Sequence, residues 1–250
     1  DYGISTNPES FASESYRAYF SDKVRGSIMR LSRDGITPIS DHGMKDWFRD
    51  NLKTSNLITG SYDDKKHEYN VTLHQIQATN SKTVSFREDV KGWVSFKSFL
   101  PENAISCANQ YYSFKDGELW KHHVDTIIDP NSGSEVSHVR NTFYGLPTNS
   151  SIKVILNDSP SVVKSFQTLN YEGSQSKVNQ LVTYNTYDPN SWNGSSYNVV
   201  TNTYTDNQYY NDQPKKGWFV NSIRTNQDEG SLKEFIEKEG KWFNFIKGKQ

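Results

Sequence analysis

The chain has 250 residues and a formal net charge of −1, and its Lys and Arg residues are scattered along it rather than clustered. This distribution provides neither the basic stripe of a nucleic-acid-binding protein nor the polybasic segment of a membrane-surface protein. No stretch approaches the roughly 18 apolar residues of a membrane-spanning helix. A single cysteine excludes an internal disulfide and a thiolate metal cluster.

Aliphatic residues are sparse in this chain, and aromatic residues supply much of its hydrophobic content. The chain contains 13 Phe, 15 Tyr and 6 Trp, whereas hydrophobic residues as a whole make up only 33%. Aromatic side chains bury large areas, and residues such as Tyr and Thr favour strands while Asn and Ser favour turns. The composition therefore predicts a folded, mainly β protein.

A repeated pattern in the first half consists of an aromatic-rich strand, a short turn of Asp, Lys and Gly, and a second strand. It occurs at residues 16–31, 60–73 and 111–122, and residues 83–99 form a similar pair around a charged turn. Alternating apolar and polar residues on both sides of such turns predict β-hairpins. Repeated hairpins predict propeller-like β architecture, which is more often a scaffold or a binding surface than a catalytic unit.

A short helix is expected between the first two hairpins. Residues 41–52 place Met44, Trp47 and Phe48 on one helical face, with Asp41 as the N-cap.

The second half has a different pattern. Residues 151–158 and 161–169 predict two longer strands, residues 180–186 and 197–204 are strand-like within an Asn/Ser/Thr/Tyr-rich region, and residues 217–224 predict a final strand. We therefore expect a propeller-like hairpin region at residues 1–146 and a second β-rich domain at 147–226.

Residues 227–250 are expected to form a short C-terminal helix and an aromatic tail. Ser231 and Glu234 have the spacing of a capping box, and Gly240 stands where a C-cap glycine belongs. The tail that follows is too aromatic to remain in water, so we expect it to dock on this domain or on a neighbouring subunit. The candidate interface residues are Trp242, Phe243, Phe245 and Ile246.

Candidate chemistry is weak throughout the sequence. Cys107 is expected to be a buried, inert thiol. His122 and His123, with His138 and Asp125 nearby, offer metal-ligand types, but neighbouring strand residues point to opposite faces, so hydrogen-bonded strand histidines are the favoured interpretation. The chain contains none of the common catalytic, phosphate-binding or calcium-binding motifs. We predict no catalytic residue, no metal and no cofactor.

A carbohydrate site is the main alternative to a purely structural surface. Exposed aromatics flanked by amides suit sugars, and the candidates are Trp192, Tyr197, Tyr209 and Tyr210. A β surface with polar edges, or an intersubunit contact, is the favoured interpretation of the same region.

Several segments taken together resemble a known family. Residues 19–39, 91–99, 140–145, 166–173 and 234–248 resemble the large tail structural proteins of tailed bacteriophages, above all the crAss-like podoviruses. The resemblance implies a virion tail component, the muzzle at the end of the tail or the large protein nearest it, without enzymatic activity. A start at Asp1 suits the C-terminal part of a longer, cleaved tail protein.

Three functions follow as hypotheses. The favoured one is a non-enzymatic tail protein that forms an oligomeric ring with other copies and other tail proteins. The second is a receptor- or glycan-binding module of the virion, and the third is a tail enzyme that degrades polysaccharide. We expect no sequence-specific nucleic-acid partner.

Overall fold

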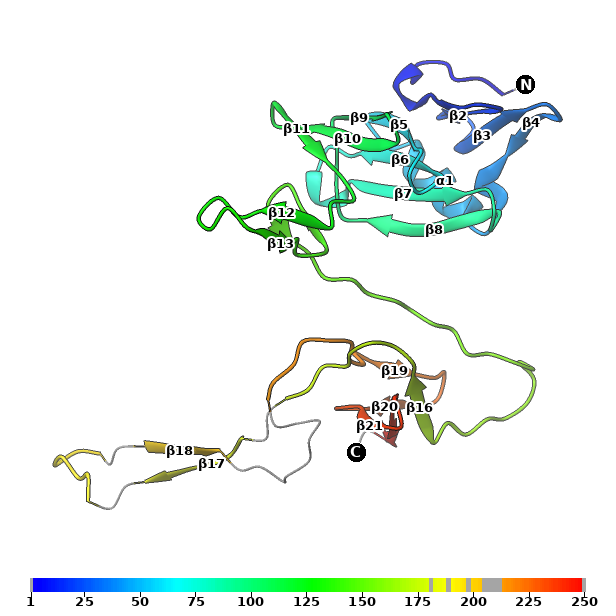
Figure 1. Cartoon of the computed structure of the whole chain (residues 1–250). Helices are drawn as coiled ribbons and strands as arrows, with labels where there is room; N and C mark the ends of the chain where they lie inside the picture. The colour runs from blue at the N-terminus through cyan, green and yellow to red at the C-terminus, as the bar shows by residue number, and fades with distance from the viewer. Residues whose placement is uncertain (1, 180–181, 188–189, 197–198, 204–212, 249–250) are drawn as a thin grey trace. The chain divides into compact units, whose positions relative to one another are not determined.

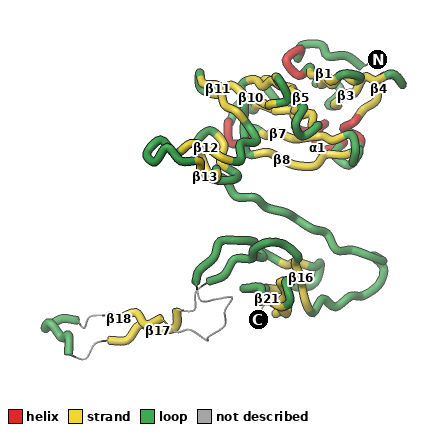
Figure 2. Tube along the Cα trace, viewed as in Figure 1, coloured by secondary structure: helices red, strands yellow, loops and turns green. Residues whose placement is uncertain are grey.

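The computed structural model describes residues 2–179, 182–187, 190–196, 199–203 and 213–248. The chain divides into two compact units, Asp1–Val154 and Ile155–Gln250. We describe each unit by itself (Figure 1). In both units the regular structure is mainly antiparallel sheet, as the composition predicts, and long loops connect the short strands of the second (Figure 2). The expected divisions near residues 146 and 226 stay predictions.

Unit 1 opens with a four-stranded antiparallel meander in which each strand pairs with the next along the chain. A short 3₁₀ helix, η1 (Pro8–Ser10), precedes it. The strands are β1 (Ala12–Glu14), β2 (Arg17–Asp22), β3 (Ser27–Ser32) and β4 (Gly35–Pro38). The first predicted hairpin is therefore confirmed, as β2 and β3.

A second four-stranded meander has the same order. Its strands are β5 (Leu57–Asp63), β6 (Glu68–His74), β7 (Lys82–Arg87) and β8 (Gly92–Lys97), with the 3₁₀ helix η3 (Ala78–Asn80) between β6 and β7. Residues 68–73 of β6 are all buried, which shows that both faces of this sheet are covered. The pairs β5–β6 and β7–β8 confirm two further predicted hairpins.

A third sheet contains three strands, β9 (Asn103–Cys107), β10 (Gln110–Lys115) and β11 (Glu118–Lys121), in the order β11–β10–β9. Asp116 and Gly117 both have positive φ and connect β10 to β11 as a two-residue turn, which confirms the fourth predicted hairpin. Two short hairpins follow, β12 (Thr126–Ile128) with β13 (Glu135–Ser137) and β14 (Thr142–Phe143) with β15 (Leu146–Pro147).

The core of unit 1 lies between the first two sheets and the helix. Tyr19 of β2 stacks on Tyr69 of β6 with ring centroids 4.8 Å apart, and both side chains are fully buried. Phe48 of the helix packs against Trp93 of β8 at 4.4 Å. Aromatic rings thus supply the buried area that the sparse aliphatic residues do not.

The helix is present but begins later than expected. It is α1 (Lys45–Leu52), preceded by the 3₁₀ helix η2 (Ile39–Asp41). The N-cap position is Met44, without a side-chain cap, so the prediction of Asp41 as N-cap is wrong. Asp41 instead ends η2 and lies 3.6 Å from Lys45 Nζ in an exposed ion pair.

The described part of unit 2 contains three small antiparallel sheets. Their strand orders are β16–β22–β21, β17–β18 and β19–β20–β23. The strands are β16 (Thr168–Tyr171), β17 (Val182–Tyr187), β18 (Val199–Thr203), β19 (Ile223–Arg224), β20 (Glu229–Ser231), β21 (Ile236–Lys238), β22 (Lys241–Phe245) and β23 (Lys247–Gly248). Its core joins Val178, Leu232, Phe235 and Trp242.

The predicted C-terminal helix is wrong, because residues 229–248 form strands and turns. Glu239 and Gly240 both have positive φ and make a two-residue turn that pairs Lys238 with Lys241. Gly240 is thus a hairpin glycine rather than a helix C-cap. The capping-box spacing at Ser231 and Glu234 is coincidental, since the residues that follow pair as β22 with β16 and β21.

Two predicted strands are also wrong. Residues 151–158 form no strand, and of residues 161–169 only the last two enter β16. The final strand predicted at 217–224 shrinks to Ile223–Arg224. A strand requires a continuous hydrogen-bonding partner, and residues 151–158 have none within the described part of the chain. In the last segment Trp218 forms only an isolated bridge with Ser176, which is too short to extend the strand.

Candidate functional site

A polar seam fixes the third sheet of unit 1 onto the second. Tyr111 of β10 and Ser61 of β5 share a buried hydrogen bond of 2.7 Å between their hydroxyls. Ser106 of β9 donates to the carbonyl oxygen of Tyr62 at 2.7 Å and accepts from the backbone N–H of Asp64 at 3.0 Å. Buried polar groups that satisfy one another in this way hold a single arrangement of sheets.

Two histidines end this seam. His122 Nε2 lies 2.6 Å from Ser113 Oγ, and His123 Nε2 lies 2.5 Å from Asp63 Oδ2. Burial, reinforced by the neighbouring His123, lowers the pKa of His122 to about 4, so its imidazole is neutral at pH 7. The histidines lie beyond β11, which ends at Lys121, and not on the strand that was predicted to carry them.

This Ser, His and Asp set is not a catalytic triad. A triad requires the carboxylate to orient the same imidazole that activates the serine. Here Asp63 binds His123, whereas Ser113 binds His122 and also lies 3.0 Å from the hydroxyl of Tyr144. Among the residues that the structure describes, no group of three or more His, Cys, Asp or Glu side chains has the arrangement of a metal site. The cluster therefore acts as a structural tie.

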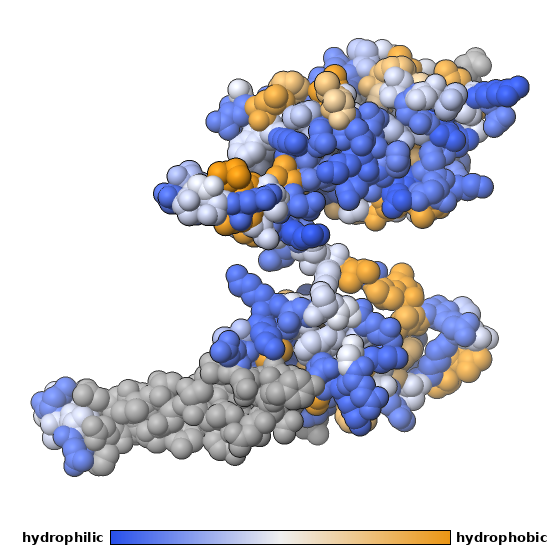
Figure 3. All heavy atoms as spheres, in the orientation of Figure 1, coloured by the Kyte–Doolittle hydropathy of each residue, from blue (hydrophilic) through white to orange (hydrophobic). Residues whose placement is uncertain are grey.

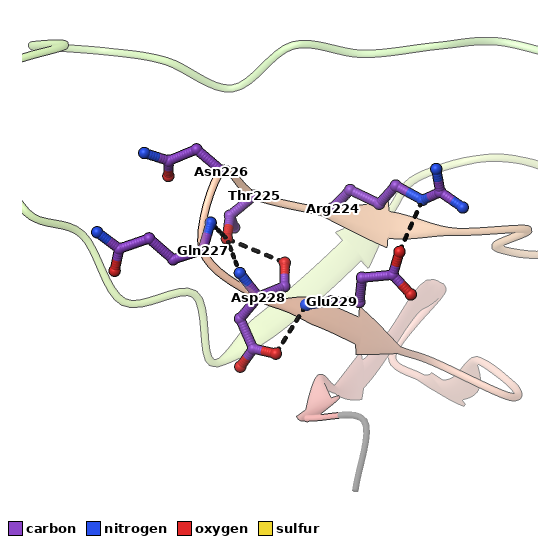
Figure 4. A pocket seen from close by; sticks show the side chains of 6 residues that line it. All are labelled: Arg224, Thr225, Asn226, Gln227, Asp228 and Glu229. Carbon is purple, nitrogen blue, oxygen red and sulfur yellow. Dashed lines mark hydrogen bonds and ion pairs between the residues drawn. The ribbon is translucent and has the colours of Figure 1, made fainter.

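Two open hollows are the candidates for a small-molecule site. Figure 4 shows the first, whose lining consists entirely of the six consecutive residues of the β19–β20 turn, 224–229. Arg224 Nε lies 3.2 Å from Glu229 Oε1, and Thr225 Oγ1 accepts from the backbone N–H of Asp228 at 2.8 Å. The turn thus satisfies its own polar groups, and no second element forms a wall.

The second hollow is lined by polar side chains of unit 1, namely Asn51, Thr54, Gln75, Asn80 and Lys82. Neither hollow has the apolar walls and convergent polar groups that a small-molecule site needs.

The third sheet presents an exposed apolar face. The register places Ile105 opposite Tyr112 and Phe114 opposite Leu119, so these four side chains share one face, opposite to the face that carries Tyr111. Ile105, Phe114 and Leu119 are exposed, as is Cys107 beside them, and the prediction of a buried thiol is wrong. We call Ile105, Tyr112, Phe114 and Leu119 the outer face. Hydrophobic residues gather over β10 and β11 in Figure 3.

Two further exposed apolar groups lie later in the chain. Ile127 of β12 pairs with Val136 of β13, and both are exposed together with Ile128. The segment after β15 carries Ile152, Val154, Ile155, Leu156 and Val163, all exposed, and forms a hydrophobic run in Figure 3. Exposed apolar clusters of this kind mark contact surfaces.

The candidate interface residues of the C-terminus lie on and just after β22. Trp242 is only 7% exposed and belongs to the core of unit 2, while Ile246 packs against the same core. Phe243 is half-buried, and Phe245 is 63% exposed. The tail thus docks on its own unit through Trp242, and Phe245 is the member that remains on the surface.

The glycan candidates are only partly visible. Trp192 lies in the connection between β17 and β18 and is 55% exposed. Tyr197, Tyr209 and Tyr210 lie outside the described residues.

Sequence reasoning missed the outer face. Its signal was present, since Tyr112 and Phe114 alternate with Tyr111 and Ser113 along β10. Alternation shows that two faces differ, but it does not show which face is covered.

The geometry defines a class of protein: a set of stacked antiparallel sheets with a satisfied polar interior, no enclosed cavity among the described residues that suits a small molecule, and several exposed apolar surfaces. These are the features of a structural component of a larger assembly. No helix among the described residues is long and apolar enough to cross a membrane.

The chain belongs to the Crassvirus muzzle protein family. Residues 1–117 match the model of the Crassvirus muzzle protein, and residues 138–249 match the model of the Crassvirus muzzle protein C-terminal domain. The family is a component of the phage tail in the virion, so the chain is a virion structural protein, as its resemblance implied. No curated protein sequence matches the chain.

Proposed function

We propose that this muzzle-family chain is a non-enzymatic building block that joins copies of itself and other tail proteins in a ring. The observation that carries the proposal is the outer face. Ile105, Phe114 and Leu119 are exposed on a sheet whose opposite face is joined to β5 through Tyr111 and Ser106. An apolar sheet face of this kind is stabilised when a second layer covers it.

The arrangement of the sheets within unit 1 supports this proposal, because it resembles part of a β-propeller. The first strands of the three meanders, β1, β5 and β9, lie side by side. Two of these sheets are four-stranded meanders, which are the blades of β-propellers, and the third has three strands. Among the described residues the sheets do not close into a complete propeller, so the remaining blades would come from neighbouring chains or from further residues of the same polypeptide.

The oligomeric state tests the proposal. Mass photometry of the full chain should show an assembly of several copies. If each copy covers the outer face of the next with a different surface of its own, the contact is head-to-tail and closes into a ring. Leu119→Lys should weaken association at least tenfold. Val24→Lys, at an exposed position in the β2–β3 turn, is the matched control and should leave it unchanged. A wild-type chain that is monomeric at every concentration, and absent from virions, would refute the proposal.

Absence of enzymatic activity is part of the same proposal. The Ser113, His122 and Asp63 cluster resembles catalytic machinery in composition only, and its groups are engaged in the seam. Incubation with host capsule polysaccharide should release no oligosaccharide. If the wild-type chain releases oligosaccharide and the Ser113→Ala variant does not, the chain is an enzyme and this part of the proposal is wrong.

Glycan binding is the second proposal, and the exposure of Trp192 supports it. An indole face suits the apolar face of a sugar ring. On a glycan array the wild-type chain should bind a host surface polysaccharide, and Trp192→Ala should lose that signal while Trp218→Ala keeps it. Silence of the wild type across host polysaccharides would remove this proposal.

A further inference from the structure

One segment has the composition of a strand but forms none. Residues 151–157 read Ser-Ile-Lys-Val-Ile-Leu-Asn, and we call them the apolar arm. Ile155 is 81% exposed, and Ile152, Val154 and Leu156 are exposed as well. In an extended chain Ile152, Val154 and Leu156 share one face, whereas the other face is mostly polar, and this alternation is typical of a strand that is covered on one side. The isolated chain therefore leaves a strand-like apolar segment uncovered.

The backbone of the arm is equally unengaged. Within the described ranges, residues 151–157 make no hydrogen bond to any other part of the chain. An extended segment of this kind binds most readily by adding a strand to the free edge of a sheet, where the backbone supplies hydrogen bonds and alternate side chains fill pockets.

Unit 1 offers one long free edge. β8 ends the order β5–β6–β7–β8, so its outer backbone groups pair with no strand among the described residues. It is six residues long and exposes Val94 (39%) and Phe96 (54%), with a β-bulge at Val94 in its pairing with β7. An exposed apolar edge strand is a template for pairing with another chain.

The other edges fit less well. β1 has three residues, β11 has four, and β4 has four and ends in Pro38, which has no backbone N–H to donate. β5 and β9 lie side by side in the interior of the stack. β8 is thus the edge whose length and side chains match the arm.

We propose that the apolar arm of one copy adds as a fifth strand to β8 of the next copy. Val154 and Leu156 share one face of the extended arm, and on the added strand they would cover the exposed ring of Phe96. Each copy has one arm and one edge, so the contact is head-to-tail and repeats around a ring. The inference rests on the proposed assembly and names a segment that holds it together.

Hydrogen exchange of the full chain tests the proposal. In the dilute monomer, amides of residues 151–157 exchange at the rate of an unstructured peptide. In the assembled form they should slow at least tenfold, together with the outward amides of residues 92–97.

A variant at the arm provides the second measurement. Val154→Pro removes a backbone N–H and should weaken assembly at least tenfold, while the urea midpoint of the monomer stays unchanged because the arm is unpaired there. Val163→Pro is the matched control, at a position that is 97% exposed and outside the arm, and it should assemble like the wild type.

The outcomes separate this proposal from the ring itself. A wild-type chain that never assembles refutes the ring and the arm together. An assembly in which the arm amides exchange as fast as in the monomer refutes the arm alone. Arm amides that are already protected in the monomer refute transfer to a second copy, and protection of the arm without protection of residues 92–97 refutes β8 as the acceptor.

Discussion

Tyr19 of β2 donates a 2.9 Å hydrogen bond to Glu88 in the β7–β8 turn, 69 residues further along the chain. Glu88 also accepts from Arg30 of β3 at 2.9 Å. One carboxylate thus ties the second sheet to two strands of the first. Burial, with the nearby charge of Glu88, raises the pKa of the Tyr19 phenol, which therefore stays a hydrogen-bond donor.

Glu88→Gln should lower the free energy of unfolding by about 1–3 kcal/mol, because it removes the charge that pairs with the half-buried Arg30. Urea unfolding measures the change. Asp89→Asn is the matched control, since Asp89 pairs with Arg87 on the surface and should contribute under about 1 kcal/mol. Equal effects of the two substitutions would contradict the special role of Glu88.

Gly60→Ala should destabilise unit 1 by about 1–3 kcal/mol or more, since overpacking displaces backbone. A methyl group at Gly60 would lie 2.0 Å from the carbonyl oxygen of Ser10, which also accepts from Tyr69 at 2.8 Å. Gly92→Ala, where the nearest atom lies at 3.6 Å, is the control and should be tolerated. Thermal unfolding of both variants distinguishes them, and a tolerated Gly60→Ala would show that η1 can move away from β5.

Stability should fall as the pH drops from about 6.5 towards 4. The pKa of His122 is about 4 in the folded chain and 6.5 as an ordinary value, so in this window the unfolded chain binds a proton that the folded chain does not. This pKa difference lowers the free energy of unfolding by about 3 kcal/mol, and the loss is complete below pH 4.

Urea midpoints measured between pH 7 and pH 4 test this expectation. His122→Gln should remove most of the slope, whereas His67→Asn, at an exposed turn position, should keep it. A wild-type chain whose stability is constant across this range would show that His122 takes up its proton without unfolding.

The two aromatic residues of β22 should behave differently. Trp242→Ala removes a buried ring from the core of unit 2 and should cost about 3–5 kcal/mol of stability. Phe245→Ala should leave stability within about 0.5 kcal/mol, because that ring is on the surface. We propose that Phe245, the candidate interface residue that stays exposed, contacts a neighbouring copy, so mass photometry should show weaker assembly for Phe245→Ala.

The first half of the chain could be predicted well because its signals are local. The turn between β10 and β11 is determined by its own residues, Asp116 and Gly117, which both adopt a positive φ. The alternation in each strand shows which residues share a face of the sheet. The pairings β2–β3, β5–β6, β7–β8 and β10–β11 all follow from such signals. The prediction of Asp41 as the N-cap of the helix failed because Asp41 belongs to the 3₁₀ helix Ile39–Asp41, and α1 begins later.

The second half was predicted less well because its signals are ambiguous. Ser231, Glu234 and Gly240 satisfy the rules for helix ends, yet Gly240 serves equally well in a hairpin turn. The choice depends on β16, some seventy residues earlier, whose Tyr171 pairs with Trp242. Such a long-range partner is not visible in a local pattern.

The sequence by itself determined that this protein is a mainly β, aromatic-rich chain of the muzzle family, because composition, turn residues and family motifs are written in consecutive residues. Only the tertiary structure decided that Asp63 and Ser113 bind different histidines, that the outer face of the third sheet is bare, and that residues 151–157 remain unpaired. The reason is physical: whether a side chain or a strand is satisfied depends on what packs beside it, and those neighbours come from distant parts of the chain.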